Sequence, residues 1–159
     1  MLKFFTIGVF GTTEDDFFQK LINNNISVFC DIRQRRGVRG SKYKFVNSIR
    51  LQQRLKELNI KYSHIKELAP SKEIRDLQRE ADQQKSETKK TRGRLGKAFI
   101  DAYKDFFLNP FDLNTFLDCL IQEGNNNIAL FCVEEKYYAC HRSIVSNKLK
   151  ALGFKVKHL

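Results

Sequence analysis

The 159-residue sequence has few cysteines and no long hydrophobic run. Its four cysteines, Cys30, Cys119, Cys132 and Cys140, lack the dense spacing of a disulfide framework, and three lie in or beside apolar stretches. No run of about 18 apolar residues occurs, so no segment is expected to span a membrane. Residues 1–11 contain one lysine and make a poor cleavage site, which predicts a first β-strand rather than a signal peptide. These absences favour a reduced, cytoplasmic protein without membrane association.

Several familiar site motifs are also missing. The sequence contains neither GxGxxG nor GxxxxGK[ST], which excludes a dinucleotide fingerprint and a P-loop. A tyrosine-phosphatase site requires arginine six positions after its cysteine, but Tyr138 and Ser146 occupy those positions. Zinc requires about four ligands, of which Cys132, Cys140 and His141 can supply three, and no CxxC pair supports such a site. We therefore expect no metal, and no cofactor is indicated.

Acidic residues are absent from two short basic segments, 33–44 and 89–97. The segments carry six and five basic residues, which equals the formal net charge of +11, so the rest of the chain is balanced at 18 basic against 18 acidic residues. A charge excess confined to two glycine-containing loops favours an anionic partner, either nucleic acid or a phosphorylated small molecule. The predicted nucleic-acid-binding residues are Arg35, Arg36, Arg39, Lys42, Lys44, Lys89, Lys90, Arg92, Arg94 and Lys97.

Hydrophobic residues make up 42% of the chain and include 14 phenylalanines, enough for a substantial buried core. Apolar runs with strand character alternate with segments of helical periodicity. This alternation predicts one α/β domain over residues 1–159: a mostly parallel sheet of about five strands with helices on both faces, in a Rossmann- or flavodoxin-like three-layer arrangement. Within it, residues 66–97 form a charged insertion in which a solvated helix leads into a mobile basic loop. The expected strands are 2–10, 26–32, 60–65, 127–132 and 154–159, and the other expected helices are 12–25, 47–59, 98–109, 111–124 and 141–153.

Polar side chains lie at or just beyond the end of each of the first four predicted strands. Open α/β sheets bind ligands beyond the carboxyl ends of their strands, and parallel strands bring those ends to one edge. We therefore expect one polar cluster there. Its members are Thr6 and Gly8 near the end of the first strand, Asp31 and Arg33 at the end of the second, His64 and Glu67 at the end of the third, and Cys132 and Glu134 at the end of the fourth, followed by Cys140, His141 and Arg142 at a helix start.

Each member of this cluster has a chemical use. Arg33 and Arg142 can bind a phosphate or carboxylate in a bidentate manner. Cys140 next to His141 at a helix start is expected to have a lowered pKa and to act as a thiolate nucleophile. The general acid and base, or the residues that orient the arginines, are Glu134 and Asp31. The predicted catalytic set is therefore Cys140, His141, Glu134 and Asp31, with Arg33, Arg142, Thr6, Gly8, His64 and Glu67 as anion- and substrate-binding residues.

Structural interpretations stand beside these functional ones. Asp31 and Arg33 can form an ion pair that only braces a strand end. Cys30 and Cys119 lie in apolar segments and are expected in the core. Packing alone also explains a cysteine at the end of a buried strand, as at position 132, and capping or packing explains Cys140.

The Cys-x-Glu of residues 132–134, followed by Cys-His-Arg at 140–142 and preceded by Asp-x-Arg at 31–33, resembles the bacterial and archaeal family called domain of unknown function 488. Further similar stretches are 6–8, 62–68, 99–103 and 156–158. The resemblance implies an α/β domain with a shared polar cluster, and it adds Tyr103 to the substrate-binding set. The sequence departs from the family at Ala69-Pro70-Ser71, where two glycines usually follow the leucine. This implies that part of the site is altered, since glycines there suggest close approach of the backbone to a ligand.

Three functions fit these observations. The first is an enzyme or enzyme-like domain that acts on a nucleotide or nucleic acid through the Cys/Glu/His/Arg cluster. The second is a non-catalytic nucleic-acid-binding module that uses the two basic loops. The third is a small-molecule or metal-binding regulatory domain.

Overall fold

The computed structural model describes residues 1–159 and has a five-stranded sheet at its centre. The strands are β1 (Lys3–Ile7), β2 (Val28–Asp31), β3 (Lys61–His64), β4 (Asn127–Phe131) and β5 (Lys155–His158). They pair in the order β3-β2-β4-β1-β5, and every pairing is parallel. The predicted parallel α/β sheet is confirmed. Because β2, β4 and β1 are adjacent, the chain segments that follow them leave the sheet side by side.

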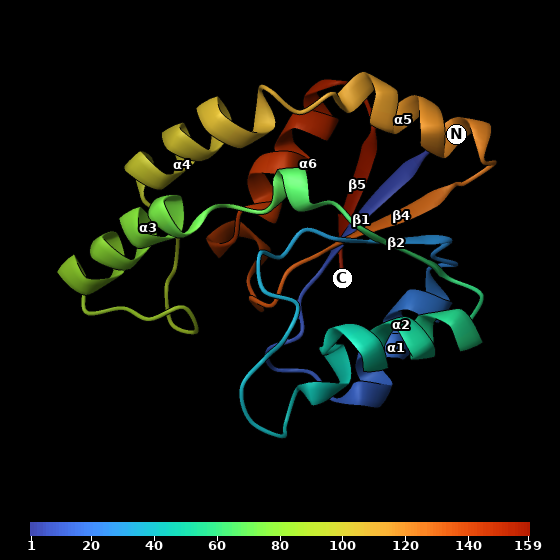
Figure 1. The fold of residues 1–159 in the computed structure, drawn as a ribbon, viewed down its shortest axis with the longest axis horizontal. Coiled ribbons are helices and arrows are strands. Elements are labelled where there is room, and N and C mark those ends of the chain that lie inside the picture. The colour runs from blue at the N-terminus through green and yellow to red at the C-terminus, as the bar shows by residue number, and fades with distance from the viewer.

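Helices cover both faces of this sheet, which gives the predicted three layers (Figure 1). Two helices, α1 (Glu14–Asn23) and α2 (Ser48–Glu57), lie on one face. The other face is covered by α4 (Lys97–Tyr103), α5 (Leu113–Gln122) and α6 (Arg142–Ala151), with α3 (Lys72–Gln84) beside α4. No helix has the length and apolar character needed to cross a membrane.

Alternating side chains divide the sheet between two hydrophobic cores. Phe4 and Leu130 pack with α5 and α6, whereas Phe5 and Phe131 pack with α1 and α2. This is the expected consequence of the two-residue repeat of a strand whose faces are both covered. Both cores are rich in phenylalanine, so the central strands are held firmly and their carboxyl ends have defined positions.

The ends of the helices follow the local chemistry of the sequence. The Thr13 side chain accepts a hydrogen bond from the Asp16 amide at 3.1 Å and caps α1. Gly153 follows the end of α6 and has a φ of +89°, the left-handed conformation expected of a glycine that stops a helix. The predicted helix 98–109 instead divides into α4 and a π-helical turn, Lys104–Leu108.

The charged segment before α4 is less solvated than its composition suggests. The inner face of α3 buries Ile74, Gln78 and Asp82. The side chain of Gln78 accepts a hydrogen bond from the Gly96 amide at 2.8 Å, and Arg92 pairs with Asp82 at 2.8 Å. The expectation of a solvated helix is therefore wrong for one face, because these polar groups fasten the basic loop 85–96 to the helix.

Candidate functional site

A pocket of about 710 Å³ lies beyond the carboxyl ends of β2 and β4. Residues 33–35 and 37–39 form one wall, α3 with residues 87–90 and Arg92 forms another, and residues 132–134 and 140–141 lie at its base. Figure 1 shows the two basic loops at the same end of the sheet, with α3 next to the second loop. The two basic segments of the sequence thus share one cavity with the Cys-x-Glu and Cys-His motifs.

The pocket lining is strongly basic. Three acidic residues, Asp82, Glu87 and Glu134, belong to it, and two of these are paired with pocket bases, Asp82 with Arg92 and Glu134 with Lys89. A cavity with this imbalance has a positive potential that attracts anions. The basic residues of the lining are Arg33, Arg35, Arg39, Arg75, Arg79, Lys89, Lys90 and Arg92.

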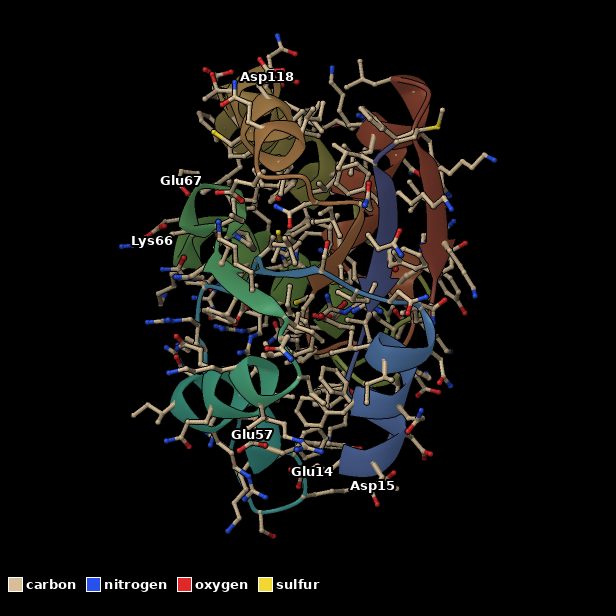
Figure 2. The ribbon with its side chains drawn as sticks, turned by 90° about the vertical axis from the view of Figure 1, so that its right-hand side faces the viewer. Glu14, Asp15, Glu57, Lys66, Glu67 and Asp118 are labelled. Carbon is tan, nitrogen blue, oxygen red and sulfur yellow. The ribbon has the colours of Figure 1, made fainter.

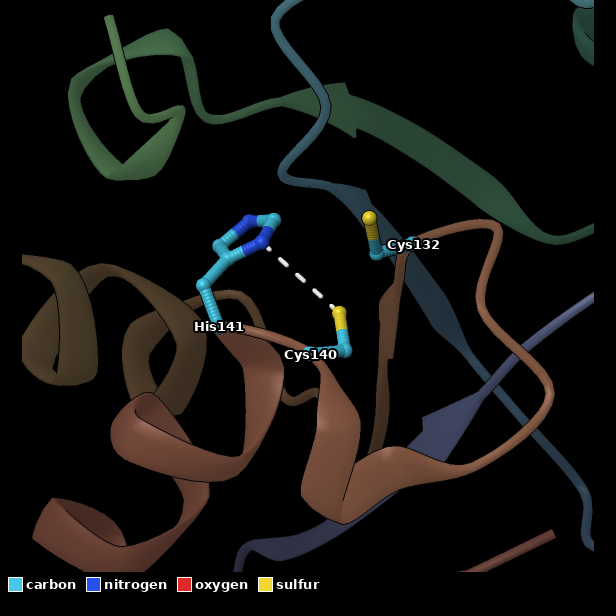
Figure 3. Close-up of side chains that lie close together, drawn as sticks. All are labelled: Cys132, Cys140 and His141. Atoms are coloured by element: carbon cyan, nitrogen blue, oxygen red, sulfur yellow. Dashed lines mark hydrogen bonds between the residues drawn. The ribbon is translucent and has the colours of Figure 1, made fainter. Parts of the chain in front are cut away.

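Two cysteines and a histidine converge at the base of the pocket (Figure 3). Their ligand atoms all lie within 4.8 Å of one another, and the Cys140 Sγ is 3.7 Å from the His141 Nδ1. The His141 Nε2 lies 2.9 Å from the carbonyl oxygen of Ile32. A carbonyl only accepts, so Nε2 carries a proton, and in the neutral ring Nδ1 presents a lone pair toward the sulfurs. These three side chains are the residues in the pocket best suited to hold a metal ion.

Glu134 and Lys89 border this group. The Cys132 thiol donates to the Glu134 Oε2 at 3.0 Å, and the Lys89 Nζ is 3.5 Å from Oε1 of the same carboxyl. Burial and the neighbouring Cys132 raise the pKa of Glu134 above its ordinary value. Burial lowers the pKa of Lys89, but Glu134 outweighs it and the net direction is upward. The carboxyl group is therefore a buried acid within reach of both a sulfur and a cation.

The two pocket cysteines differ in acidity, and the difference reverses one prediction. A hydrogen bond from Cys140 lowers the pKa of the Cys132 thiol, with a further contribution from His141. Burial and the same hydrogen bond raise the pKa of Cys140. The expected lowered pKa at Cys140 is thus wrong, because this side chain is almost fully enclosed and acts as the donor. The more acidic thiol is Cys132.

Asp31 and Arg33 form a buried ion pair at the end of β2. The Arg33 Nε and Nη2 donate to the two carboxylate oxygens at 2.8 and 2.7 Å, and the Tyr62 hydroxyl donates to one of them at 2.9 Å. Burial and the Asp31 charge raise the pKa of Tyr62 to about 12. Asp31 is 0% exposed and does not line the pocket, whereas Arg33 does. The Nη1 of Arg33 is buried without a hydrogen-bond partner.

Arg142 lies in the core behind the pocket. Its guanidinium donates to the carbonyl oxygens of Cys132 at 2.9 Å and Glu135 at 3.1 Å. The side chain is 1% exposed and is not part of the pocket lining. Its contacts fix the path of residues 132–135, so they position Glu134 from behind.

The remaining predicted substrate-binding residues lie outside the pocket lining. Thr6 is buried, and its Oγ1 forms a hydrogen bond of 2.7 Å with the His158 Nδ1. The His64 Nε2 is 2.9 Å from the Arg33 carbonyl oxygen. Glu67 is exposed and points outward beside Lys66 (Figure 2). The Tyr103 hydroxyl donates to the Leu68 carbonyl oxygen at 2.6 Å. Gly8 lies against the Glu134 backbone, where it leaves room for that segment.

The predicted nucleic-acid-binding residues divide into two groups. Arg35, Arg39, Lys89, Lys90 and Arg92 line the pocket. Lys42 and Lys44 line a separate hollow of about 330 Å³, and Arg36, Arg94 and Lys97 belong to neither cavity.

Two arginines of the pocket wall were not predicted. Arg75 and Arg79 come from α3, whose charged composition indicated only a solvated helix. Arg75 and Arg79 are four residues apart, as are Gln78 and Asp82, so each pair lies on one side of the helix. This spacing is the signal in the sequence that one side of α3 faces a site.

The two cysteines assigned to the core have different environments. Cys30 is buried in β2, and burial raises its pKa to about 12. Cys119 is exposed, so its predicted core position is wrong. On α5 the buried positions are Leu117 and Leu120, and Cys119 lies off that face.

Comparison with known proteins identifies one family. The family model described as domain of unknown function DUF488 matches residues 13–149, which covers most of the chain and includes the Asp-x-Arg, Cys-x-Glu and Cys-His-Arg motifs. No curated protein and no solved structure matches.

Proposed function

The chain belongs to the DUF488 family, and from this premise we propose that it is an enzyme acting on a nucleotide or nucleic acid. The substrate's phosphates would bind to the basic pocket wall, and its reacting group would lie at the base, next to Cys132, Glu134 and His141. The observation that carries the proposal is the single cavity formed by these two sets of residues.

The pocket wall has donors suited to phosphate oxygens. The Nη1 of Arg33 and the Nε of Arg92 are buried and have no hydrogen-bond partner. These two atoms are enclosed, so the donors open to a phosphate are the exposed side chains of Arg35, Arg39, Lys89 and Lys90, of which only Lys89 has an ion-pair partner. The cavity volume of about 710 Å³ also lies within the range of small-molecule sites, about 300–1,000 Å³.

The base of the pocket has groups suited to proton transfer. Glu134 is a buried carboxyl with a raised pKa, the environment in which a carboxylic acid works as a general acid or base near neutral pH. Lys89 lies beside it and can hold a substrate oxygen or stabilise the ionised carboxylate. The reaction would take place where these groups meet the bound anion.

Removing two exposed bases of the pocket wall, in the double variant R39A/K90A, is expected to weaken binding of a short single-stranded oligonucleotide roughly tenfold. The slope of log affinity against log salt concentration should become shallower by about 0.7 for each phosphate that the protein no longer neutralises. Fluorescence anisotropy over a salt series measures both quantities. Lys148→Ala removes an exposed base of α6 outside the pocket lining and should change neither.

Catalysis is tested with Glu134→Gln. Wild-type protein would be incubated with mixed nucleotides and with DNA and RNA oligonucleotides, and products detected by mass spectrometry. We expect a product that Glu134→Gln does not form although it still binds the oligonucleotide. Binding without any product would support the non-catalytic module instead, and binding unaffected by R39A/K90A would contradict the proposed phosphate site.

A further inference from the structure

We propose that Cys132, Cys140 and His141 form a binding site for a divalent transition metal, with zinc as the favoured ion. The inference goes beyond the proposed function and does not depend on it. It starts from three potential ligand atoms, two sulfurs and the His141 Nδ1, that converge within 4.8 Å at the base of the pocket (Figure 3). Soft thiolates combined with an imidazole select zinc over magnesium or calcium.

The separations between the ligand atoms are close to those around a tetrahedral zinc. Bonds of about 2.3 Å to sulfur and about 2.0 Å to nitrogen place a sulfur and a nitrogen about 3.5 Å apart, and two sulfurs about 3.8 Å apart. The observed distance from Cys140 Sγ to His141 Nδ1 is 3.7 Å. The widest separation, at most 4.8 Å, needs to close by about 1 Å, a movement that side-chain rotation can supply.

The orientation of His141 is an independent sign of a metal site. Its Nε2–H donates to the Ile32 carbonyl oxygen at 2.9 Å, which leaves the Nδ1 lone pair directed toward the sulfurs. Metal-binding histidines almost always donate their other ring N–H to a carbonyl, carboxylate or water in this way. The ring is also held by Tyr103, whose centroid is 5.4 Å away. The ring is therefore held in the position that a metal ligand needs before any ion arrives.

The charges around the site also match a divalent ion. Two thiolates balance a 2+ charge, while the neighbouring Glu134 carboxylate has its own counterion in Lys89. Three protein ligands leave a fourth position open, as in catalytic zinc sites. All three ligands line the basic pocket, so an ion held by them would lie at the base of that pocket. A metal there would polarise a bound water or substrate oxygen, with Glu134 close enough to accept a proton.

The test is titration of the reduced, metal-free full chain with Co²⁺, a spectroscopic probe for zinc sites. We expect one Co²⁺ per chain, with a thiolate charge-transfer band and visible bands of a tetrahedral site, both removed by adding Zn²⁺. Cys132→Ser, Cys140→Ser and His141→Asn should each lose these bands. Cys119→Ser, which changes an exposed cysteine outside the pocket, should keep them.

Circular dichroism and thermal unfolding separate loss of the site from loss of the fold. Zn²⁺ should raise the unfolding temperature of wild type and Cys119→Ser but not that of a ligand variant that remains folded. If one ligand variant fails to fold, the other two decide the result. Absence of cobalt bands in wild type, bands that survive in the folded ligand variants, or a Cys132–Cys140 disulfide that excludes the ion would overturn the inference.

The two proposals fail separately. R39A/K90A should bind Co²⁺ like wild type, and metal-free wild-type protein should still bind the oligonucleotide. Loss of cobalt binding alone would therefore remove the metal site and leave the phosphate-binding proposal unaffected.

Discussion

Replacing Gly8 with alanine is expected to destabilise the protein by about 3 kcal/mol or more. A Cβ at this position would lie 2.0 Å from the carbonyl oxygen of Glu134 and 2.9 Å from its carbon. Both atoms are backbone, so no side-chain rotation relieves the clash. The segment 132–135 is also held in place by Arg142, whose Nη2 would be 3.0 Å from the new methyl group. The whole Cys-x-Glu segment must therefore shift away from β1.

Urea unfolding measures this effect, and Gly93→Ala is the matched control. An added Cβ at Gly93 meets nothing within 4 Å, so its change in unfolding free energy should stay within about 0.5 kcal/mol. If Gly8→Ala folds, it should also lose product formation, because Glu134 and Cys132 are displaced from the base of the pocket. Equal stability of the two variants would show that the close contact between the first strand and residue 134 does not exist.

Replacing Asp31 with alanine is expected to lower the free energy of unfolding by about 3–5 kcal/mol. The change leaves the guanidinium of Arg33, which is 3% exposed, without its carboxylate partner. It also removes the acceptor of the Tyr62 hydroxyl. A buried charge without its partner destabilises the fold much more than the absence of both members of the ion pair. The double variant D31L/R33M should therefore recover much of the stability that Asp31→Ala loses.

Chemical denaturation of the single and double variants tests this account. Glu14→Ala is the control, since it breaks an ion pair with Arg50 whose side chains are 41% and 52% exposed and should cost under about 1 kcal/mol. If Asp31→Ala is as mild as the control, Asp31 is not needed for structure.

The sheet and most helices could be predicted because their signals are local. Continuous apolar runs at β2 and β4, helix-opening chemistry around Thr13 and the stop at Gly153 each depend on neighbouring residues in the chain. The first strand ends at Ile7, earlier than its apolar composition implies. Residues beyond it still pair by backbone hydrogen bonds with Val133, which composition alone does not distinguish from a strand.

The site was predictable only in part, because it depends on contacts between distant segments. The rule that parallel strands end at one edge correctly placed Glu134, His141 and Arg33 around one pocket. It does not say which way a side chain points, and Arg142 and Asp31 turn into the protein. It also does not indicate that α3 brings Arg75 and Arg79 to the opposite wall.

Thiol labelling of Cys132 with and without an oligonucleotide tests the central claim most directly, namely that the basic wall and the cysteine cluster serve one bound anion. Metal-free protein would be treated with iodoacetamide and the labelled peptides quantified by mass spectrometry. Saturating oligonucleotide should slow labelling of Cys132, at the base of the pocket, and leave the exposed Cys119 unchanged. Equal labelling of Cys132 in the presence and absence of bound oligonucleotide would place the anion elsewhere and contradict the account.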